Sequence, residues 1–125
     1  MREKYCYLPL ETEYYEIQSS KLPVGFDGCR IVFLTDLHSN LYGKENEKLI
    51  RKIEEVNPDY IMCTGDMLVG RTDCDIHVAM ELFEKLSKKW EIFYSLGNHE
   101  QKLLKYPETC DTTFVEYIDG LKNLG

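Results

Sequence analysis

No stretch of this sequence is long and apolar enough to cross a membrane. A membrane helix needs about 18 consecutive apolar residues, and no run here approaches that length. The first residues also contain no apolar core of a secretory signal. We therefore expect a soluble chain, which could associate with a membrane only through segments that these residues do not include.

Basic residues are in the minority. Fifteen lysines and arginines stand against 22 aspartates and glutamates, so the formal net charge is -7 at pH 7. Such a chain has no basic face to displace counterions from a phosphate backbone, and we expect no nucleic-acid polymer as a partner. Prolines are few, and 43% of the 125 residues are hydrophobic, which is typical of one globular domain.

The cysteines form no C-x-x-C pair, and their number, five, is odd. Both features indicate reduced thiols and a cytoplasmic location. Cys63 lies inside an apolar run with nothing nearby that would lower its pKa. We expect it to be a small buried hydrophobic residue and not a nucleophile.

Neither G-x-x-x-x-G-K-[ST] nor G-x-G-x-x-G occurs, which disfavours a nucleotide-binding domain with a doubly wound sheet. The sequence does contain three short apolar runs that predict strands, and the first of them, rich in β-branched and aromatic residues, predicts a strand buried on both faces. The three runs begin at residues 30, 60 and 91. The pattern also predicts an edge strand at 13–19 and helices at 43–59, 75–90 and 112–125.

The helix at 43–59 should stop at Asn57-Pro58, and Gly120 is a candidate C-cap of the last helix. The order β-α-β-α-β-α predicts an α/β fold with a parallel sheet and right-handed crossovers.

Each apolar run ends in residues that bind metals or phosphates. The clusters are Asp36-Leu37-His38, Gly65-Asp66 and Gly97-Asn98-His99-Glu100. If the chain stays extended after the first run, Asp36 and His38 point to the same side. The carboxyl ends of parallel strands share one edge of a sheet, so we expect the clusters to meet there.

The glycines would let the backbone turn sharply at these strand ends. Carboxylates, an amide oxygen and an imidazole together suit divalent ions such as Mn, Fe, Zn or Co.

Taken singly, each cluster has a purely structural explanation. Asp36 would cap a turn beside a solvated His38, Gly65-Asp66 would form a turn, and Asn98 would be a left-handed residue. The coincidence at three successive strand ends favours a site. Glu100 has two open explanations: it orients the ring of His99, or it begins a helix as an N-terminal acid.

The motifs D-x-H, G-D and G-N-H-E, in this order after apolar strands, resemble the calcineurin-like metallophosphoesterases over residues 30 to about 105. The resemblance implies β-sheet layers flanked by helices and two divalent metal ions bridged by an aspartate. Asp36 and His38 would hold the first ion, Asp66 would bridge both, and Asn98 would hold the second. His99 would act on the substrate.

The function that the resemblance implies is hydrolysis of a phosphomonoester or phosphodiester. Two cations can clamp the phosphoryl oxygens and acidify a bound water into a nucleophile. Protonated His99 can donate to the departing alkoxide as general acid. We expect the substrate to be a small-molecule or lipid phosphoester.

The family pattern also has a second half, with a further histidine and a G-H-x-H motif, that this chain does not contain. Its histidines are His38, His77 and His99, and we expect His77, within a helix, to be a surface or core residue. We therefore interpret residues 1–125 as the N-terminal part of one phosphoesterase domain. The alternative is a non-catalytic fragment that binds one metal or a phosphate.

A second departure concerns the protein-phosphatase branch of the family, whose motif resembles G-D-x-x-D-R-G. Here Val69 and Gly70 occupy the Asp and Arg positions, and Arg71 is expected to be a solvated loop residue that could meet a phosphate. This leaves the small-molecule, nucleotide and lipid phosphoester branches open.

Overall fold

In a computed structural model, which describes residues 10–68, 76–105 and 113–125, the three apolar runs form a parallel sheet. The strands are β1 (Ile31–Leu34), β2 (Tyr60–Cys63) and β3 (Glu91–Tyr94), in the order β1-β2-β3. Val32 is in register with Ile61, which is in register with Ile92. The predicted parallel sheet is confirmed.

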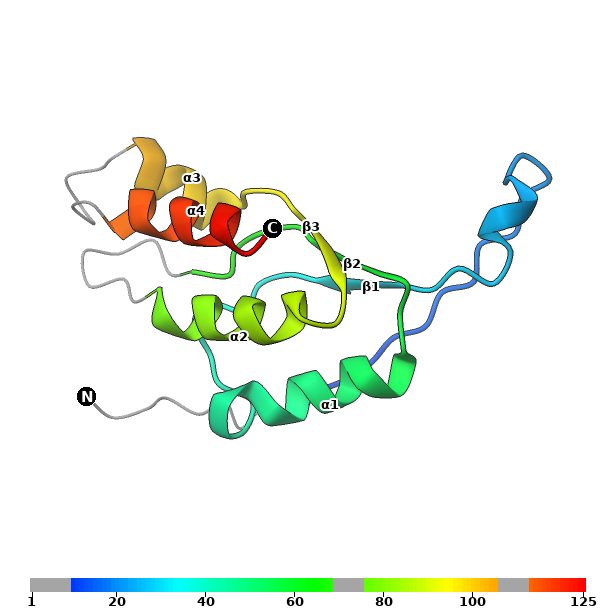
Figure 1. The fold of residues 1–125 in the computed structure, drawn as a ribbon, viewed down its shortest axis with the longest axis horizontal. Coiled ribbons are helices and arrows are strands. Elements are labelled where there is room, and N and C mark those ends of the chain that lie inside the picture. Colours follow the sequence, from blue (N-terminus) through cyan, green and yellow to red (C-terminus); the bar gives the residue numbers. More distant parts are fainter. Residues whose placement is uncertain (1–9, 69–75, 106–112) are drawn as a thin grey trace.

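Helices connect the strands in the predicted order (Figure 1). α1 (Glu47–Val56) follows the short 3-10 helix η2 (Lys44–Asn46), and α2 (His77–Ser87) precedes β3. α1 ends where predicted, because Asn57 adopts a left-handed conformation and donates its N–H to the carbonyl of Ile53. Two helices, α3 (Asn98–Lys105) and α4 (Thr113–Asn123), follow β3.

One face of the sheet packs on helices. Side chains in register on parallel strands share a face, and the buried face carries Ile61 and Cys63 at its centre. The helical residues in the same core come from α1, α2 and α4: Leu49, Ile53, Ala79, Leu82, Phe83, Leu86 and Tyr117. This packing fixes the strand ends relative to the helices that follow them.

The opposite face of the sheet is exposed, so the prediction that the first strand is buried on both faces is wrong. Phe33 and Phe93 are 64% and 51% exposed, and Ile31 lies beside them in the same alternating pattern. Tyr60 shares this face, with its ring centroid 6.0 Å from that of Phe93. The described helices contribute their buried residues to the other face.

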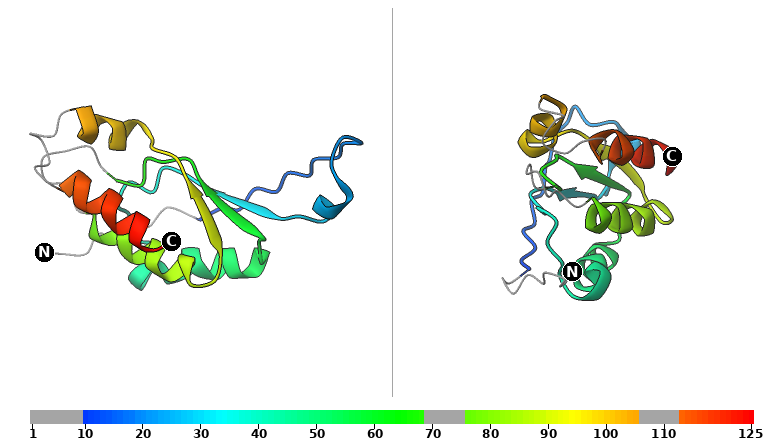
Figure 2. Two further views of the ribbon diagram at one scale, coloured as in Figure 1. Left: turned by 45° about the horizontal axis from the view of Figure 1, so that its top comes forward. Right: turned by 90° about the vertical axis from the view of Figure 1, so that its left-hand side faces the viewer.

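The segment before β1 is not the edge strand predicted at 13–19. Its residues are exposed and extend away from the sheet, with the short 3-10 helix η1 (Val24–Phe26) at the far end (Figures 1 and 2). Tyr14, Tyr15 and Ile17 favour strands, but a strand needs a neighbour for its backbone hydrogen bonds. The described sheet supplies none to this segment.

Gly120 is not a helix cap, because it lies inside α4, which continues to Asn123. A Cβ atom at this position would lie 2.7 Å from Cε of Met80 in α2. The glycine therefore lets two helices approach closely. Within the part of the chain that the structure describes, no helix has the length and apolar character to span a membrane.

Candidate metal centre

The pairing of the first two strands continues beyond their ends. The N–H groups of Asp36, His38 and Ser39 donate to the carbonyls of Gly65, Asp66 and Met67, at 3.1, 3.0 and 2.9 Å. The D-x-H and G-D motifs therefore lie side by side. This convergence follows from the parallel topology predicted from the sequence.

The backbone of these loops is not extended. Asp36, His38 and Ser39 have φ angles of 58°, 48° and 55°, and Asp66 has 53°. The left-handed region is uncommon for residues other than glycine and is concentrated at functional sites. Asp36 and His38 nevertheless meet, with 3.3 Å between Oδ1 and Nε2, and both side chains reach solvent.

Two glycines bring the third motif against the second. A Cβ atom on Gly65 would lie 2.0 Å from the amide nitrogen of Gly97, and one on Gly97 would lie 2.3 Å from that of Asp66. Only glycine allows backbones to approach this closely. The contact places α3 so that the N–H of His99 donates to Oδ1 of Asp66 at 2.8 Å.

The first and third motifs also meet directly. The rings of His38 and His99 make an edge-to-face contact. Asn98 is the first residue of α3, between Gly97 and His99, and its side chain is exposed. The structure thus brings Asp36, His38, Asp66 and His99 into one neighbourhood, with Asn98 at its border.

The donor atoms fit a divalent ion in kind, since carboxylate oxygens and imidazole nitrogens are ligands that such ions accept. Asp36 and His38 supply one donor of each kind, 3.3 Å apart. Over residues 10–68, 76–105 and 113–125, however, no three His, Cys, Asp or Glu side chains form a group that could hold an ion together.

Glu100 has a role that neither sequence-based explanation contained. Its side chain is fully buried, and its carboxylate accepts hydrogen bonds from the N–H of Asp66 at 2.9 Å and of Met67 at 3.0 Å. It also accepts one from the hydroxyl of Tyr94. It does lie in the first turn of α3, as one explanation had it. No sequence pattern predicts that Glu100 accepts hydrogen bonds from the backbone N–H groups of Asp66 and Met67.

His77 and Cys63 behave as expected for residues outside the chemistry. His77 is an exposed residue at the start of α2, 3.9 Å from the carboxylate of Glu81. Cys63 is buried, and burial raises the pKa of its thiol to about 12, which keeps it protonated and unreactive. Val69, Gly70 and Arg71 lie outside the described residues.

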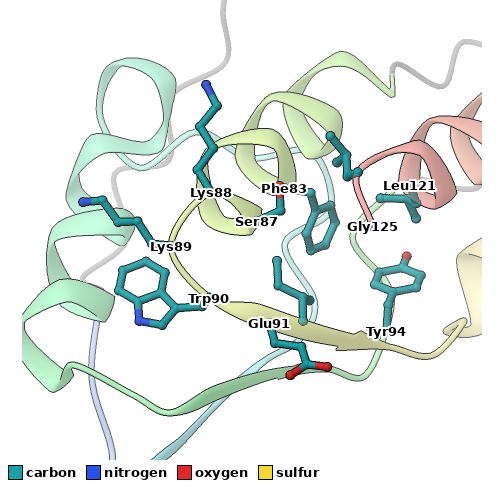
Figure 3. A pocket seen from close by; sticks show the side chains of 11 residues that line it. Phe83, Ser87, Lys88, Lys89, Trp90, Glu91, Tyr94, Leu121 and Gly125 are labelled. Atoms are coloured by element: carbon teal, nitrogen blue, oxygen red, sulfur yellow. The ribbon is translucent and has the colours of Figure 1, made fainter.

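A hollow of about 410 Å³ lies away from the strand ends, between α2, the beginning of β3 and the end of α4 (Figure 3). Phe83, Trp90 and Leu121 are among the residues that line it. Trp90 and Glu91 mark the amino end of β3, whereas the three motifs follow the carboxyl ends of the strands. The hollow is therefore separate from the candidate metal centre.

Comparison with known proteins agrees with the motifs. The family model described as calcineurin-like phosphoesterase matches residues 29–124. The uncharacterised metallophosphoesterase YkuE of Bacillus subtilis is 36% identical over 94 residues, which are 73% of this chain and 33% of that protein. The uncharacterised metallophosphoesterase Cj0846 of Campylobacter jejuni is 34% identical over 73 residues, 57% of this chain and 19% of that protein.

A zebrafish transmembrane protein with a metallophosphoesterase domain is 26% identical over 87 residues, 68% of this chain and 20% of that protein. The chain thus spans a third or less of the length of these relatives. No solved structure matches it significantly.

Proposed function

The chain belongs to the calcineurin-like phosphoesterase family, and on that premise we propose that it contributes the metal centre of an enzyme that hydrolyses a phosphomonoester or phosphodiester. The observation that carries the proposal is the meeting of three motifs at one sheet edge. Asp36 and His38 lie beside the Asp66 loop, and His99 bonds to the carboxylate of Asp66.

In this proposal Asp36 and His38 hold one divalent ion, Asn98 holds a second, and Asp66 binds both. The mixed oxygen and nitrogen donors favour Mn, Fe, Zn or Co. Such ions, when bound, supply positive charge for the phosphoryl oxygens and make water more acidic at neutral pH. Asp66 suits the position shared by the two ions, because its loop contacts both the D-x-H loop and the G-N-H-E loop.

His99 is proposed to protonate the leaving oxygen of the substrate as general acid. The hydrogen bond from its backbone to Asp66 ties the residue to the metal centre. Its ring, in contact with that of His38, is thereby held beside the proposed ligands. A group so placed can reach the substrate without being a ligand itself.

We propose that these residues act within a longer domain of which they form the N-terminal part. Two observations support this: the matched residues make up only 33%, 19% and 20% of the three relatives, and the face of the sheet that carries Phe33 and Phe93 is exposed. Further ligands from that remainder would complete the centre, since the described residues include no three-residue group.

The proposed substrate is a small-molecule or lipid phosphoester. The net charge of -7 disfavours a nucleic-acid polymer, because polyanion binding depends on basic side chains. A cytoplasmic location is proposed from the five cysteines. Attachment to a membrane, as the name of the zebrafish relative describes for that protein, would come from segments beyond these residues.

A second candidate function is the binding of a single metal ion or a phosphate without catalysis. It is favoured by the close pair of Asp36 and His38, which lie 3.3 Å apart and can share one ligand. Elemental analysis of the complete domain, with its remaining ligands present, separates the two functions. Two ions per molecule support the hydrolase, whereas one ion or none supports the binding module.

The hydrolase is tested with an aryl phosphomonoester and an aryl phosphodiester in the presence of Mn²⁺. Asp66→Asn keeps an oxygen for the N–H of His99 but removes the charge, and should lower turnover at least about a hundredfold. Asp27→Asn is the matched control, because Asp27 is exposed beside η1. Equal turnover in both variants would rule out the role of Asp66.

A further inference from the structure

A line of buried and half-buried hydrogen bonds connects α4 to the Asp66 loop. The hydroxyl of Tyr117 in α4 donates to the hydroxyl of Tyr94 in β3 at 2.9 Å. Tyr94 in turn donates to Oε1 of Glu100, which also accepts from the N–H of Met67. The other carboxylate oxygen accepts from the N–H of Asp66. Four elements, α4, β3, α3 and the loop after β2, are thereby joined.

This line matters because the carboxylate at its centre has no access to water. Glu100 and Tyr117 are both 0% exposed. A buried carboxylate is costly unless donors surround it, and its hydrogen bonds gain strength in the low dielectric of the interior. The hydroxyl of Tyr94 is one of the donors to Glu100, and the two backbone N–H groups are others.

The two tyrosines are fixed as donors. Burial raises the pKa of both hydroxyls, so both keep their protons at neutral pH. The ring of Tyr94 packs edge to face on Phe83, at 5.4 Å between centroids, and on Tyr117 at 6.2 Å. Packing on two sides holds the Tyr94 hydroxyl in position to donate its hydrogen bond to Glu100.

We propose that Tyr94 and Tyr117 are positioning residues for Asp66. They act through Glu100, which holds the backbone of Asp66 and Met67, and so the docking of α4 determines how the Asp66 carboxylate is presented. The inference rests on the proposed function in one respect, which is that Asp66 binds metal. Tyr94, Tyr117 and Glu100 are neither metal ligands nor in contact with substrate in this proposal.

The first test measures amide hydrogen exchange at Asp66 and Met67 by NMR. Tyr94→Phe removes one hydroxyl and keeps the ring packing, and should speed exchange at both amides about three- to tenfold. Tyr117→Phe should have a smaller effect in the same direction. Tyr60→Phe is the matched control, because Tyr60 lies on the exposed face of the sheet. If exchange at Asp66 and Met67 in Tyr94→Phe were as slow as in the unchanged chain, the proposal would be overturned.

A double variant separates hydrogen bonds that act in series from two independent hydroxyl effects. If Tyr117 acts through Tyr94, then Tyr117→Phe adds nothing to exchange at Asp66 once Tyr94→Phe is present. Effects that multiply would show that the two hydroxyls act independently of each other, and would overturn the proposal. Thermal unfolding of each variant confirms that exchange is compared between folded chains.

The third test measures the Mn²⁺ affinity of the complete domain by isothermal titration calorimetry, because the proposed centre takes further ligands from outside these residues. Tyr94→Phe should weaken binding about three- to tenfold, whereas Tyr60→Phe should leave it unchanged. Equal affinity in Tyr94→Phe and the unchanged chain would overturn the link to the metal. If the complete domain binds no Mn²⁺, the proposed function fails, while the exchange experiments still decide whether the tyrosines position Asp66.

Discussion

The imidazole rings of His38 and His99 lie edge to face, with 4.7 Å between their centroids and 69° between their planes. His38 follows β1 and His99 lies in the first turn of α3, so the contact joins the first and last motifs of the candidate metal centre. Two adjacent histidines with different proposed roles, a ligand and a general acid, can be told apart experimentally.

His99→Gln should lower turnover of an aryl phosphoester about 10²- to 10⁴-fold, because the general acid is lost, and should leave the metal content unchanged. His38→Gln should lower the metal content as well, because it removes a proposed ligand. Steady-state kinetics and elemental analysis of both variants check this. Loss of metal from His99→Gln would show that His99 is itself a ligand.

Gly65→Ala and Gly97→Ala should each destabilise the fold by about 2 to 4 kcal/mol, since the new Cβ atoms would meet backbone and Gly65 has a φ of 98°. Gly25→Ala is the control, because nothing lies within 4 Å of a Cβ there. Urea denaturation measures the differences. An effect at Gly65 as small as that at Gly25 would contradict the close approach of the two loops.

Stability should fall in alkaline solution. The Cys63 thiol has a reference pKa of 9.0, which burial raises to about 12, so the folded chain holds this proton more tightly than the unfolded chain. The stabilisation is complete below about pH 9 and is lost as pH rises through about 12, at no more than about 1.4 kcal/mol per pH unit. Urea denaturation across this range measures the slope.

Cys63→Ala is the control for this slope. It leaves a cavity and lowers stability at every pH, but stability should fall less steeply above about pH 9. The buried hydroxyls of Tyr94 and Tyr117, whose pKa values burial also raises, leave some slope in the variant. An identical slope with and without the thiol would contradict the prediction.

The exposed face of the sheet should cause self-association of the isolated chain. Phe33 and Phe93 are exposed on either side of Met62, and Ile31 is exposed on the same face; exposed apolar surfaces of this kind pair with one another in water. Phe33→Thr combined with Phe93→Thr should reduce the association measured by sedimentation velocity. Val24→Thr changes an exposed apolar residue far from the sheet and should have no effect; a monomeric unchanged chain would contradict the prediction.

The sequence was informative where local pattern and topology act together. Short apolar runs separated by amphipathic helices predicted the parallel sheet, and that sheet placed Asp36, His38 and Asp66 at one edge. It was uninformative where the formation of a strand depends on whether a neighbouring strand is present. Tyr14 and Tyr15 have strand propensity but no neighbouring strand in the described sheet.

The local geometry of the centre was also hidden. The sequence around Asp36 and His38 does not predict their left-handed backbone, which accompanies the pairing with the Asp66 loop. Glu100 reads as a surface acid at the start of a helix, and its burial follows from backbone amides and a tyrosine hydroxyl that only the folded chain brings together.

The hydrogen bonds between residues 36–39 and 65–67 have a consequence for engineering. Neither loop can be grafted onto another scaffold alone, because each supplies the backbone template on which the other adopts its shape. A transplant would have to carry both loops, the paired strands that lead into them and the glycine of the third motif.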